Sequence, residues 1–231
     1  MSTVGRPDIR TLPPLVDGEM LDRATFHERY AAMPPQTRAE LIGGVVYMAS
    51  PLSLGHGEVD DDACYWLGHY RRHTKGLRSA SNATVKFEDY GEPQPDLQLF
   101  IREELGGQSR VVDGYVVGAP ELLIEVSRST RRKDLGPKKE DYERAGVLEY
   151  IFIGIDPDEI RWFALRGGRY VQLQPGAGGL YRSGVFHGLW LDPKALLAGD
   201  LEAVVAALDL GLATPEHAAF VARLAEAAAH P

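Results

Sequence analysis

Residues 121–127 read ELLIEVS, and this stretch constrains the fold more than any other part of the chain. Four of the seven residues are Leu, Ile or Val, a composition typical of a strand that is buried on both faces. Glu125 lies in the middle of this run. A carboxylate in a dry, apolar strand costs several kcal/mol unless it has a partner. The rest of the sequence must therefore supply that partner or bind one.

The bulk composition predicts one domain with a sizeable core. The chain has 231 residues, of which 44% are hydrophobic. Its single cysteine, Cys64, cannot form an internal disulfide. We find no apolar signal segment at the start, and no apolar run approaches the about 20 residues that a membrane span needs. We therefore expect a cytoplasmic protein with no membrane association.

The charge is unevenly distributed along the chain. The net charge of -8 argues against a partner as acidic as nucleic acid. Directly after the strand of Glu125, however, residues 128–139 hold six basic residues and one acidic residue, Asp134. The basic residues are Arg128, Arg131, Arg132, Lys133, Lys138 and Lys139. Taken alone, such a run is more often a solvated loop and helix face.

The order of predicted elements indicates an α/β fold, a central mixed β-sheet flanked by helices. In the first half of the chain we expect a Pro-rich irregular arm over 1–20, a helix capped by Asp22, a hairpin over 39–50 that turns at Gly43-Gly44, and a helix over 54–72. Strands are expected at 83–87, 96–101 and 121–126, with a loop over 103–118. A helix from Asp134 through Ala145, which Gly146 ends, and strands at 148–155, 161–165 and 169–174 follow. An Ala/Leu-rich helical tail covers 193–231.

A second carboxylate, Asp96, begins an apolar strand in PQPDLQLF, where Pro95 suits a strand start. Two carboxylates on neighbouring strands repel each other if they converge, so one takes a proton or a cation neutralises both. Hard oxygen ligands suit Mg²⁺ or Mn²⁺. A metal held by Asp96 and Glu125 would explain the buried Glu125. A buried Glu125 paired with an arginine is the alternative.

These features together resemble the Uma-type restriction endonuclease family of the PD-(D/E)xK nuclease superfamily, formerly a domain of unknown function. The resemblance is carried by AELIGGVVYMASP, His56, QPDLQLF, APELLIEVSRSTRRKDLGPKKEDYERAGVLEYIFIGID and GGRYVQL. It covers roughly residues 20 to 192. It implies a restriction-endonuclease-like nuclease domain over 21–192, preceded by the arm and followed by the tail, with a Mg²⁺ site at the edge of the sheet.

The resemblance also implies which acidic residues form the site. Asp96 matches the motif aspartate and Glu125 the second acidic residue. Glu40 matches an additional acidic residue of such sites, as a catalytic residue and a possible further ligand. The backbone carbonyl of Val126 would complete the metal ligands. His56 matches a family histidine and could bind the metal or position a water, although it lies beside acidic residues that offset the helix dipole.

The lysine of the motif is displaced in this chain. It should lie two residues after Glu125, where the sequence has Ser127. In the Uma-type pattern it lies on the following helix, which gives Lys138, with Lys139 as an adjacent alternative. Lys138 would stabilise charge on the phosphorus. The nucleic-acid-binding residues would be Arg128, Arg131, Arg132, Lys133 and Lys139, which contact phosphates without reading sequence.

The resulting hypothesis is a metal-dependent endonuclease that hydrolyses phosphodiester bonds, with DNA preferred over RNA and Mg²⁺ or Mn²⁺ as the cofactor. The resemblance also implies a homodimer. The alternative is a non-catalytic nucleic-acid- or protein-binding module that retains the nuclease fold, which Ser127 and the net charge of -8 favour. A nuclease acting on RNA or a small nucleotide is a further alternative.

Overall fold

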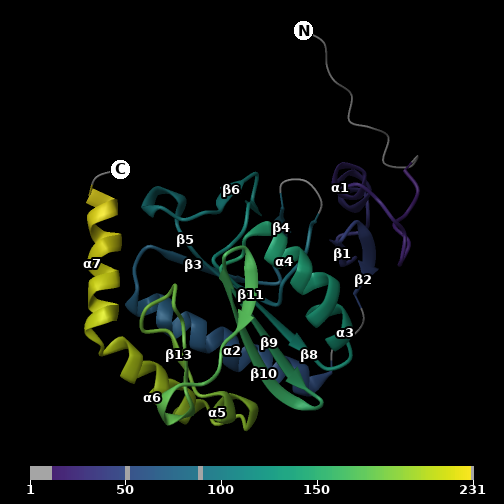
Figure 1. Cartoon of the computed structure of the whole chain (residues 1–231). Helices are drawn as coiled ribbons and strands as arrows, with labels where there is room; N and C mark the ends of the chain where they lie inside the picture. The colour runs from purple at the N-terminus through teal and green to yellow at the C-terminus, as the bar shows by residue number, and fades with distance from the viewer. Residues whose placement is uncertain (1–11, 50–52, 88–90, 230–231) are drawn as a thin grey trace.

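The computed structural model describes residues 12–49, 53–87 and 91–229 (Figure 1). Its centre is a six-stranded sheet in the order β11-β10-β9-β8-β5-β3. The strands are β3 (Leu77–Ser81), β5 (Leu97–Ile101), β8 (Leu122–Ser127), β9 (Glu149–Ile155), β10 (Asp158–Arg166) and β11 (Arg169–Gln172). Strands β8 and β9 are parallel and the other neighbours are antiparallel, so the predicted mixed sheet is confirmed.

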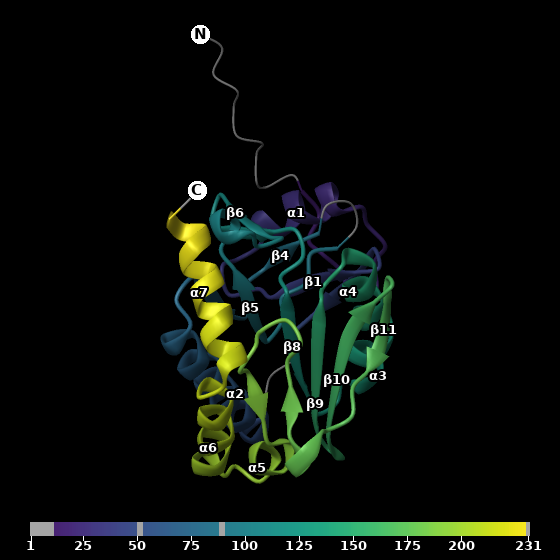
Figure 2. The same cartoon turned by 60° about the vertical axis from the view of Figure 1, so that its left-hand side comes forward.

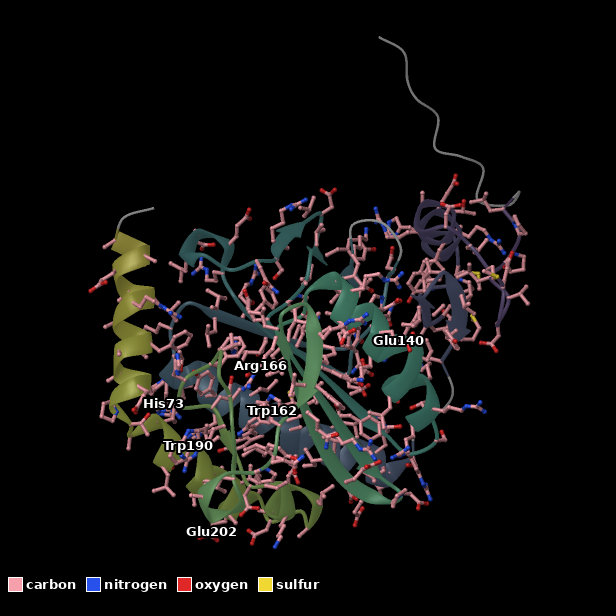
Figure 3. The ribbon with its side chains drawn as sticks, viewed as in Figure 1. His73, Glu140, Trp162, Arg166, Trp190 and Glu202 are labelled. Atoms are coloured by element: carbon pink, nitrogen blue, oxygen red, sulfur yellow. The ribbon has the colours of Figure 1, made fainter. Side chains whose placement is uncertain are left out.

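Helices cover both faces of this sheet (Figures 1 and 2). One face packs against α2 (Leu54–His73), together with α5 (Pro193–Leu197) and α6 (Leu201–Leu212). The other face packs against α4 (Lys139–Ala145). In Figure 3, Trp162 of β10 lies in the middle of the side chains, whereas Glu202 of α6 lies at the lower edge. Glu140 on α4 is exposed.

Alternate residues of β8 face these two layers, as the pleat of a strand requires. Leu122, Ile124 and Val126 belong to the core on the α2 side, and Leu123 belongs to the core on the α4 side. Glu125 therefore faces α4.

The N-terminal unit follows the sequence prediction. Helix α1 (Arg23–Ala31) is capped by Asp22, whose side chain accepts a hydrogen bond from the Thr25 backbone N–H at 2.9 Å. Strands β1 (Ala39–Ile42) and β2 (Val45–Met48) form the expected hairpin. Both turn residues, Gly43 and Gly44, have positive φ, which explains the two glycines.

The predicted irregular arm is only partly described. Residues 1–11 lie outside the described residues. Residues 16–20 are not irregular, because Gly18 N–H donates to the Val46 carbonyl at 2.8 Å and Val46 N–H donates to the Glu19 carbonyl at 2.8 Å. This segment therefore lies along β2 and belongs to the N-terminal unit.

The predicted loop over 103–118 is wrong. After a single 3₁₀ turn, η1 (Glu103–Leu105), the chain forms a hairpin of β6 (Arg110–Val112) and β7 (Tyr115–Val117), and β7 pairs in parallel with β4 (Val85–Lys86). Asp113 and Gly114 make its turn, both with positive φ. Asp-Gly is a hairpin signal, but the exposed Arg110–Val112 segment lacks the alternation that marks a strand.

The helix predicted from Asp134 begins earlier and contains a kink. It starts as α3 (Arg131–Lys133), passes through a kinked segment, η2 (Asp134–Lys138), and continues as α4. Gly136, at φ -108° and ψ -112°, breaks the helical geometry before Pro137. Asp134 is therefore inside the helical segment and not its N-cap. Gly146 ends α4 in the left-handed conformation, as predicted.

The C-terminal tail is helical but bent. Helices α6 and α7 (Pro215–Ala229) meet at 69°. No single described helix is long and apolar enough to cross a membrane, although this bent pair passes on length and composition. We expect apolar stripes at Val204, Val205, Leu208, Phe220, Val221 and Leu224 from the helical spacing of the tail. The structure buries Val204, Leu208, Phe220 and Leu224 in the core, whereas Val205 and Val221 are half-buried. Before these helices, η3 (Ala177–Gly179) and the short strands β12 (Tyr181–Arg182) and β13 (Trp190–Leu191) connect the sheet to the tail.

Candidate active site

Strand pairing brings Asp96 and Glu125 together. Leu97 of β5 lies opposite Ile124 of β8 in the antiparallel pair, so one further residue places Asp96 opposite Glu125. Opposed residues of an antiparallel pair point to the same face of a sheet. The Asp96 Oδ2 atom also accepts a hydrogen bond from the Val126 backbone N–H at 2.7 Å. Both carboxylates line one cavity.

This cavity has a volume of about 580 Å³. It lies between the edge of the sheet, the β1–β2 hairpin, the start of α2 and the segment from residue 128 to 138. Its charged and imidazole side chains are those of Arg38, Glu40, His56, Asp96, Glu125, Arg128, Lys133, Asp134 and Lys138. The cavity therefore gathers the predicted acidic residues, Lys138, His56 and part of the basic segment.

Lys138, and not Lys139, reaches the carboxylates. The Lys138 Nζ atom lies 2.6 Å from Glu40 Oε1 and 2.9 Å from Glu125 Oε2, and the side chain is 2% exposed. Burial alone would lower the pKa of Lys138, but Glu125 and Glu40 raise it above its usual value, so it remains charged. The Lys139 Nζ atom instead lies over the aromatic ring of Phe163 on β10, 4.7 Å from the ring centroid.

The partners of the buried Glu125 are a lysine and a tyrosine, so Glu125 pairs with a basic side chain, but this is Lys138 and not an arginine. The Tyr142 hydroxyl, one helical turn after Lys138, donates to Glu125 Oε1 at 2.6 Å. Burial raises the pKa of Glu125 well above its usual range. Lys138 opposes that shift, while the carboxylates of Asp96 and Asp134 add to it. Glu125 thus holds its proton more tightly than a solvated glutamate does.

Glu40 has a different environment. Its Oε1 atom accepts from the Gln94 backbone N–H at 2.8 Å and from Lys138, and its Oε2 atom accepts from Lys133 at 3.0 Å. Burial alone would raise its pKa, but Lys138 and Lys133 outweigh burial and lower the pKa to about 2. Glu40 is therefore an ionised carboxylate with lysines at both oxygens.

Asp96 is less well compensated. Burial, together with the Glu40 and Asp134 carboxylates, raises the pKa of Asp96 to about 6, against the opposing effects of Lys138 and the Val126 N–H. Its Oδ1 atom lies 3.9 Å from His56 Nε2, too far for a hydrogen bond. His56 is buried near the start of α2, and burial lowers its pKa. The structure thus brings His56 beside Asp96.

Asp60, one turn after His56 on α2, belongs to the same surroundings. Burial, with the nearby Asp96 carboxylate, raises the pKa of Asp60 to about 6. Its Oδ1 atom is buried and has no hydrogen-bond partner among the described residues. This region is therefore short of positive charge.

The basic segment divides in the structure. Arg128 and Lys133 line the cavity. Arg131 instead donates through Nε to Glu159 Oε1 of β10 at 2.6 Å, and Arg132 is exposed. Arg38 of the N-terminal unit, which the sequence did not point to, also lines the cavity. Of the predicted phosphate-binding residues, only Arg128 and Lys133 therefore line the cavity.

Asp134 is the main site residue that sequence reasoning missed, since it was interpreted as a helix cap. Its side chain is 2% exposed and lines the cavity. The Thr130 hydroxyl donates to Asp134 Oδ2 at 2.6 Å and lies 3.0 Å from the Ser127 hydroxyl. A signal was present, because Asp134, Lys138 and Tyr142 are spaced four residues apart and so share a helix face.

Comparison with known proteins identifies the family. The family model Uma2, described as "Putative restriction endonuclease", matches residues 24–194. The chain belongs to the Uma2 family. This confirms the resemblance found in the sequence. None of the curated proteins compared with this Uma2 member matches it.

A solved structure shares the fold of this Uma2 member. It is described as a "putative nuclease belonging to DUF820" from Anabaena variabilis ATCC 29413. The two chains superpose with a TM-score of 0.57 at 16% sequence identity, over 74% of this chain and 97% of the other. At this identity the likeness concerns the fold, and it agrees with the mixed sheet flanked by helices.

The donor set of the cavity suits a hard divalent cation. Within residues 12–49, 53–87 and 91–229, no three His, Cys, Asp or Glu side chains are grouped so as to hold a metal ion unaided. Mg²⁺ does not need such a cage, since proteins usually bind it through one or two carboxylates, with waters and substrate phosphates completing the octahedron. Asp96 and Glu125 are two such carboxylates. The raised pKa of Asp96 shows that nearby positive charge does not fully offset its burial, so a bound cation would stabilise its ionised form.

Proposed function

We propose that this protein is a metal-dependent endonuclease that hydrolyses phosphodiester bonds in DNA. Membership of Uma2 and the nuclease-like fold support the reaction class. One observation carries the proposal furthest: four carboxylates, Glu40, Asp96, Glu125 and Asp134, gather in the enclosed part of one cavity, where Lys133 and Lys138 are the only lysines, while Arg38 and Arg128 line the same cavity as exposed residues. A divalent cation bound between Asp96 and Glu125 would favour the ionised forms of these two carboxylates.

Asp96, Glu125 and the Val126 carbonyl would hold the metal, which is Mg²⁺ or Mn²⁺. When bound, the cation would polarise the phosphate and lower the pKa of a water molecule. Glu40 would position the two lysines and would not bind the metal, because each of its oxygens contacts an ammonium group. His56 lies beside Asp96, where it can position a water or a phosphate oxygen.

Lys138 would stabilise the negative charge that develops on the phosphate. Its ammonium group is held in place by Glu40 and Glu125, so little reorganisation is needed during the reaction. Tyr142 would orient Glu125 through the hydrogen bond to Oε1. Lys138 would thereby take the role of the motif lysine, whose usual position is occupied by Ser127 in this chain.

DNA is proposed as the substrate because the family is described as restriction endonucleases. Arg128 and Arg38 at the cavity would contact neighbouring phosphates, which is a sequence-independent interaction. A homodimer and a cytoplasmic location remain predictions from the resemblance and the composition.

The test compares wild type with Asp96→Asn on supercoiled plasmid, single-stranded DNA and RNA. Each reaction contains Mg²⁺, Mn²⁺ or a chelator at low salt. Asparagine can still accept the Val126 hydrogen bond, so the fold should persist while cleavage and metal binding are lost. Asp61→Asn, an exposed acidic residue of α2, is the matched control and should cleave like wild type.

The outcomes separate the candidate functions. Cleavage of RNA in preference to DNA would correct the substrate. Nucleic-acid binding without cleavage under any metal would support the non-catalytic module. Equal cleavage by Asp96→Asn and wild type would mean that the activity comes from elsewhere.

A further inference from the structure

The two lysines that bind Glu40 are held very differently. Lys138 is 2% exposed and contacts both Glu40 and Glu125. Lys133 is 21% exposed, lies on the cavity wall and contacts Glu40 Oε2 at 3.0 Å. Its Nζ atom also lies 5.5 Å from the Tyr47 ring centroid on β2. Lys138 is therefore held by two carboxylates, whereas Lys133 has one carboxylate partner and is the more exposed of the two lysines that line the cavity.

The kink in the helical segment is what lets both lysines reach one carboxylate. Residues five apart on a regular α-helix lie about 140° apart around the axis. Between Lys133 and Lys138 the helix is instead broken at Gly136, whose φ and ψ are not helical. The break places α3 and α4 beside the β1–β2 hairpin that carries Glu40 (Figure 1).

We propose that Lys133 is a phosphate-binding residue of the active site and that Glu40 is its partner only in the free protein. This inference rests on the proposed nuclease function, and it adds to the predicted phosphate contact of Lys133 the exchange of its partner between Glu40 and the phosphate. When a DNA strand enters the cavity, the Lys133 ammonium group leaves Glu40 Oε2 and binds a non-bridging phosphate oxygen. Lys138 stays between Glu40 and Glu125.

The exchange is physically inexpensive. Lys133 replaces one charge-assisted hydrogen bond with another, and its flexible stem allows the ammonium group to turn. Glu40 keeps Lys138 and the Gln94 N–H at Oε1, so it retains a charged partner. The bound phosphate then takes the place of Glu40 as the anionic partner of Lys133. Lys133 is more exposed than Lys138, so it is the lysine that an entering phosphate can reach.

The experiment is a double-mutant cycle on DNA binding, measured by fluorescence anisotropy with a labelled oligodeoxynucleotide. Wild type, Lys133→Ala, Glu40→Gln and the double variant are compared in a chelator, so that no cleavage intervenes. Lys133→Ala should weaken binding about tenfold and lower the salt-dependence slope by about 0.7 to 0.9. Lys194→Ala on α5, which removes the same charge from an exposed lysine outside the cavity, should bind like wild type.

Glu40→Gln gives the distinguishing result. It should tighten binding severalfold because Lys133 no longer has a competing carboxylate, and that gain should disappear in the Lys133→Ala background. In Mg²⁺, Lys133→Ala should raise KM more than it lowers kcat. Circular dichroism of each variant checks that the fold is retained.

Two results would overturn the exchange. If Glu40→Gln tightens binding equally with and without Lys133, the effect is only the loss of a negative charge. If Lys133→Ala binds like wild type, Lys133 is no phosphate contact. Either result with an active wild type refutes this inference alone, whereas a wild type that neither binds nor cleaves any nucleic acid refutes the proposed function as well.

Discussion

Replacing Lys138 with methionine tests the charge balance of the cavity most directly. Methionine keeps most of the buried volume and removes the ammonium group, which lies 2.6 Å from Glu40 and 2.9 Å from Glu125. Glu40 retains Lys133, whereas Glu125 retains only the Tyr142 hydroxyl among the partners described above. The main loss therefore falls on Glu125.

The size of the effect follows from burial. Removing one partner of a buried ion pair costs about 3–5 kcal/mol when the other charge stays unpaired. Glu125 can escape part of this cost by taking a proton, since its pKa is already raised. We therefore expect Lys138→Met to lose about 2–4 kcal/mol of unfolding free energy at neutral pH. A domain of ordinary stability remains folded after such a loss.

The sign of the pH dependence is specific. The folded pKa of Glu125 lies above the value of 4.5 that it has when unfolded, and Lys138→Met raises it further. Between these two values the folded state binds more protons than the unfolded state, so stability falls as pH rises. The variant should therefore be closer to wild type at about pH 5 than at about pH 8.

Urea unfolding of both proteins at the two pH values measures this difference. Lys139→Met is the matched control, because the adjacent lysine contacts the Phe163 ring and should lose at most about 1 kcal/mol. The reasoning fails if Lys139→Met is as destabilised as Lys138→Met, or if the loss in Lys138→Met does not grow with pH. In Mg²⁺, kcat of Lys138→Met should fall about 10²–10³-fold.

Three further predictions concern the same structure. Mg²⁺ affinity, measured by calorimetry, should fall as pH drops through about 6, the pKa of Asp96, because the metal needs the ionised carboxylate; affinity that is flat from about pH 5 to 8 would contradict this. Tyr142→Phe removes the donor to Glu125 and should cost about 1–2 kcal/mol in urea unfolding, whereas Tyr65→Phe on the surface should cost nothing measurable. Leu208→Ala in α6 should cost about 2–5 kcal/mol without changing Mg²⁺ affinity, and a lost metal site in a folded variant would give the tail a catalytic part.

The predictable parts of the fold are those with strong local signals. Local sequence patterns predicted the strand β8 from its apolar run, the hairpin turn from Gly43-Gly44 and the helix start from Asp22. The structure contains all three. Strand β3 has no such signal, since Leu77–Ser81 is mostly polar and lies at the edge of the sheet. This strand forms because its backbone pairs with β5, a residue contact that is distant in the sequence and that local patterns do not reveal.

The candidate site divides in the same way. Asp96 and Glu125 could be placed together because both lie on apolar strands, and Lys138 could be placed through the family resemblance. The contact of both lysines with Glu40 could not be predicted, because it depends on the break in the helix at Gly136. Pro137 in a helical pattern indicates an irregularity there, but not which side chains it brings together.

The charge balance also bears on the choice between an enzyme and a binding module. Ser127 lies two residues after Glu125 and so faces the same side of the sheet, and Lys138 supplies the missing charge from the helical layer above it. A module that only bound DNA would gain nothing from carboxylates placed close together at Asp96, Glu125 and Asp134, because they repel phosphates and cost stability when buried. A divalent cation bound there would remove both penalties, so this group of carboxylates favours the enzyme.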